Sequence, residues 1–256
     1  MTKKNIACLL IHGFGGSPFE LQDLASTLSQ AGYFTRLPLL PGHGQDLNAF
    51  HQTGFNDWVI FVEQEYLRLK KEFSQVFVIG FSMGGSLGLY LAQKYELPGL
   101  VSIAAPVFLY RIFPFKAPDW KLPLVPILRY FRKYWPIDPA SPQSRQIAPW
   151  QGYEGAMALH PLTSLVKGIK KVRQGLPKIK CPLLVLHSPQ DKTCIVDNAW
   201  EIITKVNSPI RRLELLPIEE RITSGHLLPT HQETKERVKE IVLNFVNYII
   251  QVKSEA

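Results

Sequence analysis

Residues 76–85 read Val-Phe-Val-Ile-Gly-Phe-Ser-Met-Gly-Gly, an apolar run that leads into a G-x-S-x-G pattern centred on Ser82. The run 76–79 predicts a strand buried on both faces, and residues 83–95 predict a helix directly after it. On so sharp a turn the serine backbone is strained, and we expect a side chain at either flanking glycine to collide with the neighbouring strand or helix. The serine oxygen would lie exposed at a helix N-terminus, where free amides favour a developing negative charge.

The rest of the chain alternates in the same way between short apolar runs and amphipathic stretches, interrupted once. This alternation predicts one mainly parallel sheet with helices on both faces, joined by right-handed crossovers. The expected strands are 6–11, 33–38, 76–79, 100–104, 183–187 and 212–216, and the expected helices include 57–73, 162–174, 198–206 and 233–250.

A further helix is expected to begin at Ser17. Here Ser17 is interpreted as the N-cap, Pro18 as the first helical residue and Glu20 as the carboxylate of a capping box. The helix should end near Gly32.

The interruption, residues 107–155, has a composition of its own. It holds 11 of the 28 aromatic residues and eight of the 20 prolines. The chain has a net charge of +8, but the basic excess is regional, with 13 basic and 3 acidic residues between positions 107 and 180. We therefore expect a core made of residues 1–106 and 156–256, with an inserted aromatic and basic cap over 107–155. No nucleic-acid partner is expected, because the basic region coincides with this insertion.

Several classes of protein are excluded by what the sequence lacks. No apolar run approaches the roughly 18 residues that span a bilayer, and the run after Lys3 and Lys4 is too short for a signal peptide, so we expect a cytoplasmic protein. Three cysteines without CxxC spacing, Cys8, Cys181 and Cys194, indicate packing residues rather than disulfides or a zinc site. No pair of histidines has metal-ligand spacing, so neither a metal nor another cofactor is expected.

A serine hydroxyl needs a neighbouring base, usually an imidazole that a carboxylate steers. Asp191 follows the expected strand 183–187, and His226 follows the last strand. The carboxyl ends of parallel strands meet at one edge of a sheet, where reactive groups collect. Asp197 is the alternative acid, but it is better explained as a capping carboxylate of the helix that follows.

Two backbone amides are expected to receive the substrate oxyanion, those of Met83 and Phe14. Phe14 lies in a glycine-rich loop, residues 12–16, after the first strand. Loss of one such donor would cost roughly 3 kcal/mol of transition-state stabilisation. His12 is expected to brace this loop. His43, between two glycines, is interpreted as a turn residue that ties down a loop near the site, with direct substrate contact as the alternative.

These motifs together resemble the α/β-hydrolase family, of the carboxylesterase and monoacylglycerol-lipase type. The resemblance rests on HGFGG at residues 12–16, LPGHG at 40–44, GFSMGG at 80–85, Asp191, and SGH at 224–226. It implies an α/β-hydrolase fold with a minimal, mostly parallel six-stranded sheet and an inserted cap. It also implies that Ser82 is the nucleophile, Asp191 the acid and His226 the base of a serine esterase that acts on esters with hydrophobic acyl chains.

Substrate identity is left more open than the fold. The same three residues serve thioesterases, acyltransferases and carbon–carbon bond hydrolases, and a non-catalytic ligand-binding receptor on a hydrolase scaffold is a further alternative. Beside His43, the candidate substrate-binding residues are Phe113, Trp120 and Trp135 of the cap. The cap aromatics would line an acyl pocket, while its basic residues either face water or rest on anionic lipid. The residues for such a lipid surface are Arg111, Phe113, Phe115, Lys116, Trp120, Lys121, Arg129, Tyr130, Phe131, Arg132, Lys133, Tyr134 and Trp135.

Overall fold

A six-stranded sheet runs through the centre of the molecule. The structure is a computed structural model that describes residues 5–110 and 122–255. Every paired strand in this sheet is parallel, as predicted. The order across the sheet is β2 (Phe34–Arg36), β1 (Ile6–Ile11), β3 (Gln75–Phe81), β4 (Leu100–Ile103), β7 (Leu183–His187) and β8 (Arg211–Leu215).

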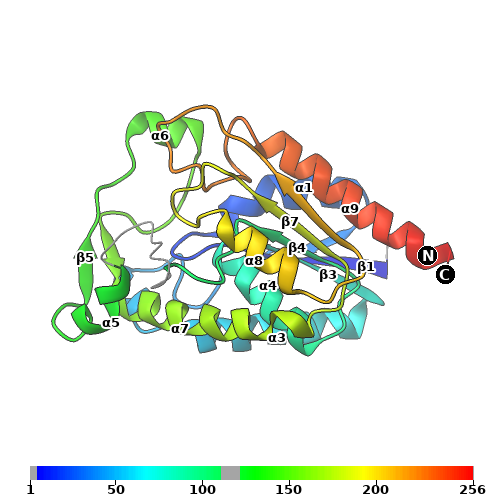
Figure 1. Cartoon of the computed structure of the whole chain (residues 1–256), viewed down its shortest axis with the longest axis horizontal. Helices are drawn as coiled ribbons and strands as arrows, with labels where there is room; N and C mark the ends of the chain where they lie inside the picture. Colours follow the sequence, from blue (N-terminus) through cyan, green and yellow to red (C-terminus); the bar gives the residue numbers. More distant parts are fainter. Residues whose placement is uncertain (1–4, 111–121, 256) are drawn as a thin grey trace.

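Helices cover both faces of the sheet (Figure 1). Four helices pack against one face, in a single apolar cluster: α3 (Phe55–Glu72), α4 (Met83–Lys94), α7 (Leu159–Gly175) and α8 (Asp197–Lys205). The opposite face is covered by α1 (Gln22–Gln30) and α9 (Lys235–Glu255), in a second cluster. Successive residues of β1 belong to the two clusters in turn, which is the period of two that a strand requires.

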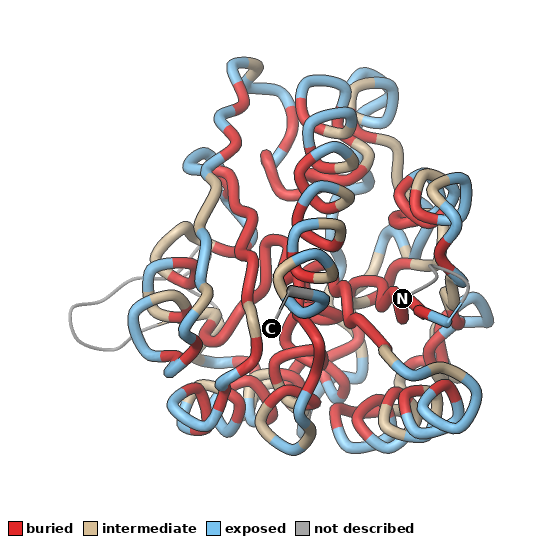
Figure 2. Tube along the Cα trace, turned by 90° about the vertical axis from the view of Figure 1, so that its right-hand side faces the viewer, coloured by how far each residue is buried: buried red, intermediate tan, exposed pale blue. Residues whose placement is uncertain are grey.

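Burial is greatest at the middle of the sheet (Figure 2). All six residues of β1 are buried, whereas the edge strands β2 and β8 contain exposed positions. This explains why the strands 6–11 and 183–187 were predicted correctly at both ends, since a strand buried on both faces is a continuous apolar run. The edge strands start or stop one to two residues away from their predicted limits.

The predicted helix start at Ser17 is wrong. Residues Pro18–Leu21 form a 3-10 turn, η2, and α1 begins only at Gln22. The Ser17 hydroxyl caps nothing, and the Glu20 side chain turns inward instead of closing a capping box. The helix does end as expected, with Gly32 just beyond it at a φ of 94°.

The described part of the inserted segment, residues 107–110 and 122–155, lies beyond one end of the sheet (Figure 1). Its described part contains a short turn η3 (Leu122–Leu124), α5 (Val125–Leu128), β5 (Tyr134–Pro136) and α6 (Pro142–Ile147). β5 pairs antiparallel with β6 (Ala156–Ala158), which starts just after the predicted end of the insertion. Two candidate residues, Phe113 and Trp120, lie outside the described residues.

The remaining short elements are α2 (Leu47–His51), which was not predicted, and η4 (Leu176–Lys178). No helix in the described ranges is both long enough and apolar enough to cross a bilayer.

Candidate active site

Ser82 sits on the tight turn between β3 and α4, with φ 52° and ψ −122°. This is backbone that a residue with a side chain rarely adopts. A Cβ on Gly84 would lie 2.0 Å from the Ile11 carbonyl oxygen, and one on Gly80 would lie 2.2 Å from the Gly84 carbonyl oxygen. The predicted reason for both glycines is confirmed, because the turn packs backbone against backbone on each side.

The structure brings Ser82, Asp191 and His226 together in one line. His226 Nε2 lies 2.9 Å from Ser82 Oγ, and His226 Nδ1 lies 2.7 Å from Asp191 Oδ2. An ionised carboxylate can only accept, so Nδ1 carries the proton and Nε2 is left to accept from the serine hydroxyl. This is the arrangement in which an imidazole can deprotonate a serine.

Asp191 is held ionised and in one orientation. Its other oxygen, Oδ1, accepts from the amides of Thr193 and Cys194, each at 2.8 Å. Burial raises the pKa of Asp191, but the adjacent His226 and the hydrogen bonds from both histidines outweigh it and hold the pKa at about 2. Asp197, the alternative acid, is the first residue of α8 and lies in the first turn of that helix.

His187, at the end of β7, is a neighbour of the site that the sequence did not single out. Its Nε2 lies 2.6 Å from the Cys194 carbonyl oxygen and 3.4 Å from Asp191 Oδ2. Both of these atoms are acceptors, so Nε2 carries the proton, and the buried ring lies beside the same carboxylate oxygen that His226 contacts. Only its position at the carboxyl end of a strand could have indicated this role.

The glycine-rich loop after β1 is tied on both sides of Phe14. The Gly13 amide donates to Glu20 Oε2 at 2.6 Å, and the Gly15 amide donates to His43 Nε2 at 3.1 Å. In the described part of the chain the amide of Phe14 between them has no protein acceptor, and Met83 is the first residue of α4, whose amide has no partner within the helix. Two donors are therefore free beside Ser82.

His12 and His43 both serve the backbone of this region. His12 Nε2 accepts from the Leu40 amide at 3.1 Å, which fastens the loop 40–44 to the end of β1, as the expected bracing role requires. His43 is fully buried, and its Nδ1 faces the Pro41 carbonyl oxygen at 3.1 Å. The expectation that His43 contacts the substrate directly is therefore wrong, because the residue is buried and both of its ring nitrogens already have backbone partners.

A cavity of about 620 Å³ opens onto Ser82 and His226. Its aliphatic side chains include Leu109, Leu122 and Ile137 of the inserted segment, Met157 of β6, and Leu162 and Leu165 of α7. Polar groups lie elsewhere on the wall, among them Arg145, Glu154, Lys192, Thr223 and Ser224. The described lining includes Trp150 and Tyr153 but not Trp135, which is half-buried in β5.

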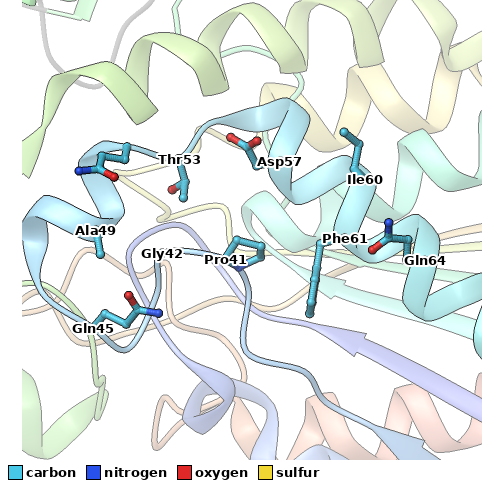
Figure 3. Close-up of a pocket in the computed structure, with 10 residues that line it drawn as sticks. Pro41, Gly42, Gln45, Ala49, Thr53, Asp57, Ile60, Phe61 and Gln64 are labelled. Carbon is cyan, nitrogen blue, oxygen red and sulfur yellow. The ribbon is translucent and has the colours of Figure 1, made fainter.

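A second hollow, of about 540 Å³, lies over α2 and α3 (Figure 3). Its described lining includes Gly42, Thr53, Asp57 and Gln64, and contains none of the three reactive residues. The Asp57 carboxylate accepts from the Gly54 amide at the start of α3, so it has a structural role there.

Within residues 5–110 and 122–255, no group of three or more histidine, cysteine or acidic side chains is placed to hold a metal ion. The three cysteines are free and buried. Cys194 borders the cavity, where burial raises its pKa well above the usual value and keeps the thiol neutral.

Known proteins resemble this chain over most of its length. It is 33% identical over 204 residues to a thermostable monoacylglycerol lipase of Bacillus sp. strain H-257, covering 79% of this chain and 77% of that protein. It is 27% identical over 241 residues to a carboxylesterase of Bacillus subtilis strain 168, covering 94% and 92%.

Solved structures show the same fold. A structure reported for the metagenome-derived lipolytic enzymes LipS and LipT superposes with a TM-score of 0.81 at 23% identity, over 96% of this chain and 94% of that one. A monoacylglycerol lipase of Paleococcus ferrophilus gives 0.76 at 16% identity, over 95% and 94%. The Hydrolase_4 family, described as Serine aminopeptidase, S33, matches residues 2–218. By fold and by this match, the chain is an α/β-hydrolase that belongs to the Serine aminopeptidase, S33 family.

Proposed function

We propose that this protein hydrolyses carboxylic esters with a hydrophobic acyl chain, through an acyl-enzyme formed on Ser82. One observation carries the proposal: the hydrogen-bonded line from Asp191 through His226 to Ser82 ends in a cavity with an aliphatic wall. The similarity to a monoacylglycerol lipase and a carboxylesterase supports the same reaction class.

In the first half of the reaction, Ser82 Oγ attacks the ester carbonyl carbon while His226 Nε2 takes the hydroxyl proton. The amides of Phe14 and Met83 receive the negative charge on the carbonyl oxygen. When the tetrahedral intermediate collapses, the carbon–oxygen bond to the alcohol breaks, and His226 gives its proton to the leaving oxygen.

In the second half, His226 takes a proton from water, and the resulting hydroxide attacks the acyl carbon. The bond to Ser82 Oγ breaks, the serine recovers its proton from His226, and the free acid leaves. Asp191 stays ionised throughout and stabilises the imidazolium that forms twice in each cycle.

Electrostatics favour this cycle. Burial lowers the pKa of His226, but the charge and hydrogen bond of Asp191 and the charge of Glu20 outweigh burial, so the net pKa is raised. A base with a raised pKa takes the serine proton more readily, provided that it is neutral at the working pH.

In this proposal the inserted segment, residues 107–155, forms a cap over the cavity and determines which acyl chains fit. Aliphatic side chains of Leu122 and Ile137 from this segment, and of Met157 just after it, line the cavity, where they would bury the acyl chain of a substrate. Each methylene buried there contributes about 0.8 kcal/mol to binding. Affinity should therefore rise with chain length until the cavity is filled.

The test is a substrate panel. Turnover is measured on p-nitrophenyl esters with acyl chains from about two to about sixteen carbons, on monoacylglycerols, on thioesters, on a vinylogous diketone, and on amino-acid p-nitroanilides because of the family description. We expect esters with medium or long chains to give the highest kcat/KM. Faster cleavage of the thioester, diketone or anilide would reassign the reaction class.

A fluorophosphonate probe separates an enzyme from a silent receptor. The wild-type protein should be labelled at Ser82, and the Ser82→Ala variant should not be labelled. Failure of the folded wild-type protein to react would favour the receptor alternative.

We further propose that the cap contacts anionic lipid. Ile127, Tyr130 and Phe131 are exposed, the last two at 74% and 81%, and Arg129, Arg132 and Lys133 lie among them. Exposed aromatic groups interleaved with basic residues are typical of surfaces that rest on membranes. Arg111, Lys116 and Lys121, the other expected basic contacts, lie outside the described residues.

Vesicle sedimentation tests this contact. Binding to phosphatidylserine vesicles should exceed binding to phosphatidylcholine vesicles, fall at high salt, and fall in the Phe131→Ala variant. Tyr248→Ala is the matched control, because Tyr248 is also exposed but lies on α9. Equal binding to both kinds of vesicle would rule out the contact.

A further inference from the structure

Glu20 is a buried carboxylate that the proposed reaction does not use. Only 2% of this residue is exposed to solvent, yet it borders the same cavity as Ser82. Burial raises the pKa of Glu20 to about 7, against hydrogen bonds that act in the opposite direction. A buried carboxylate costs free energy to retain, and groups of this kind are concentrated at functional sites.

The two oxygens of Glu20 accept from two different parts of the molecule. Oε2 accepts from the Gly13 amide at 2.6 Å, and Oε1 accepts from Trp150 Nε1 at 2.6 Å, across 130 positions of sequence. Gly16 leaves room for this arrangement, because a Cβ there would lie 2.0 Å from Oε1. The carboxylate therefore joins the loop after β1 to the inserted segment.

The same stretch of the inserted segment contacts the loop at a second place. The Tyr153 amide donates to the Gly15 carbonyl oxygen at 2.9 Å, and the Tyr153 hydroxyl donates to the Gly42 carbonyl oxygen at 2.5 Å. Glu20 thus holds the His12–Gly13 peptide. The next two peptides flank Phe14: the Gly13 carbonyl oxygen lies 3.0 Å from His12 Nδ1, and the Gly15 amide donates to His43.

We propose that Glu20 is a positioning residue for the reaction proposed above. It holds the His12–Gly13 peptide, directly before the peptide that carries the Phe14 amide, so that this amide faces the substrate oxygen, and through Trp150 it makes the geometry depend on the position of the cap. The proposal rests on the function assigned to Ser82 in the preceding subsection, and adds a residue that acts through the oxyanion loop rather than on the substrate.

A carboxylate suits this position better than an amide. Both partners are N–H donors, so a glutamine could accept from only one of them and would turn its own N–H toward the other. Hydrogen bonds to a charged acceptor are also roughly twice as strong as neutral ones. In addition, the negative charge of Glu20 favours the imidazolium form of His226, which develops in each transition state.

The experiment compares five forms of the enzyme: wild type, Glu20→Gln, Trp150→Phe, the double variant, and Glu72→Gln. Glu72 is exposed at the end of α3, so it is a matched control for the chemical change. Steady-state kinetics on a p-nitrophenyl ester are recorded from about pH 5 to about pH 9, with thermal unfolding measured on each form.

We expect Glu20→Gln to lower kcat roughly ten- to hundredfold with little change in KM. The reason is that the Phe14 amide would be displaced, and its hydrogen bond to the substrate oxygen matters mainly in the transition state. Trp150→Phe should lower kcat by a smaller factor. The double variant should be no slower than Glu20→Gln alone, since both changes break one connection. Glu72→Gln should match the wild type.

The pH profile separates this role from a merely structural one. The charged groups of the described chain that raise the pKa of His226 are Asp191 and Glu20, and His187 acts on Asp191 in turn. Removing the charge of Glu20 should therefore move the acid limb of kcat/KM to lower pH. A variant that was only less stable would keep the wild-type limb.

Two outcomes would overturn the proposal. One is a wild-type kcat together with an unmoved acid limb in Glu20→Gln. The other is a wild-type kcat in Trp150→Phe, a variant that still tests the proposal if Glu20→Gln does not fold. NMR titration of the His226 imidazole should show the lower pKa in Glu20→Gln even without turnover. A wild-type protein that cleaves no ester would refute the proposed function, while this titration would still test Glu20.

Discussion

His226 Nε2 lies 2.9 Å from Ser82 Oγ, although 144 positions of sequence separate the two residues. Ser82 directly follows β3, and His226 follows β8, three strands away across the sheet. The loop after β8 must therefore reach back along the edge of the sheet to place the imidazole. There the ring of Phe81 lies 5.1 Å from that of His226 and helps to fix it. Five consequences of this arrangement can be measured.

The strained backbone of Ser82 should cost stability. At φ 52° and ψ −122° a side chain costs about 1–3 kcal/mol, of which the greater freedom of unfolded glycine offsets about 0.5–1 kcal/mol. The free energy of unfolding of Ser82→Gly should thus exceed that of Ser82→Ala by about 1 kcal/mol, and its urea midpoint should be higher. Equal or reversed midpoints would mean that the turn is not strained.

Replacement of Asp191 by asparagine should reduce kcat by roughly ten thousandfold. The amide would donate toward His226 Nδ1 and favour the wrong tautomer of the imidazole. The measurement is kcat on the best ester of the panel, with Asp197→Asn as the matched control, because Asp197 lies in the first turn of α8. If Asp197→Asn were the slower variant, the assignment of the acid would be reversed.

The activity should rise with pH along an acid limb to which His226 and Glu20 both contribute, because burial raises the pKa of Glu20 to about 7. Only neutral His226 can take the serine proton, and its pKa is raised above the usual 6.5, so the midpoint of kcat/KM should lie above 6.5. Asp191, with a pKa of about 2, stays ionised across this range and adds no second limb. A midpoint below 6.5 would contradict the stabilising effect of Asp191 on the imidazolium.

Gly84→Ala should prevent normal folding. The new Cβ would lie 2.0 Å from the Ile11 carbonyl oxygen, and the buried backbone of β1 cannot move aside. We expect a loss of at least about 3 kcal/mol in the free energy of unfolding. Gly155→Ala is the control: its φ is 77° but nothing lies within 4 Å, so it should lose only about 1 kcal/mol. Similar losses at both sites would refute the steric argument.

His43 should weaken the protein in acid. Burial lowers its pKa from 6.5 to about 4. The unfolded chain therefore takes up a proton below pH 6.5 that the folded chain does not, and stability falls as the pH drops from 6.5 to 4, by up to about 3 kcal/mol.

Glu20 and His226 have raised pKa values, so over part of this range their protonation stabilises the folded protein as the pH falls. The effect of His43 is therefore measured as the difference in stability between the wild type and His43→Gln. Urea unfolding of both proteins should show the wild type losing more stability than the variant on acidification. A constant difference between them would contradict the prediction.

The glycine-serine turn and the segments that form strands could be predicted because they depend on local chemistry. Only glycine fits at positions 80 and 84, and a doubly buried strand such as β1 has to be continuously apolar. The three reactive residues followed, since each lies just beyond the carboxyl end of a strand.

Glu20 illustrates where local reasoning failed. The pattern Ser17, Pro18, Glu20 is typical of a capping box, and its residue types are correct for one. The side chain instead bonds to Gly13 and Trp150, which lie on other segments. Sequence spacing carries no information about a partner 130 positions away, so a strong local pattern gave a wrong side-chain assignment.

The sequence by itself determined the parallel sheet and the strained turn at Ser82, because these follow from periodicity and from residues that few conformations tolerate. It also indicated Asp191 and His226 as the candidate acid and base, because each follows a strand of the sheet. Only the tertiary structure decided that His43 is buried away from the cavity, that aliphatic side chains form its wall, and that Glu20 joins the oxyanion loop to the inserted segment. Those features depend on contacts between distant segments, which form only when the whole core packs at once.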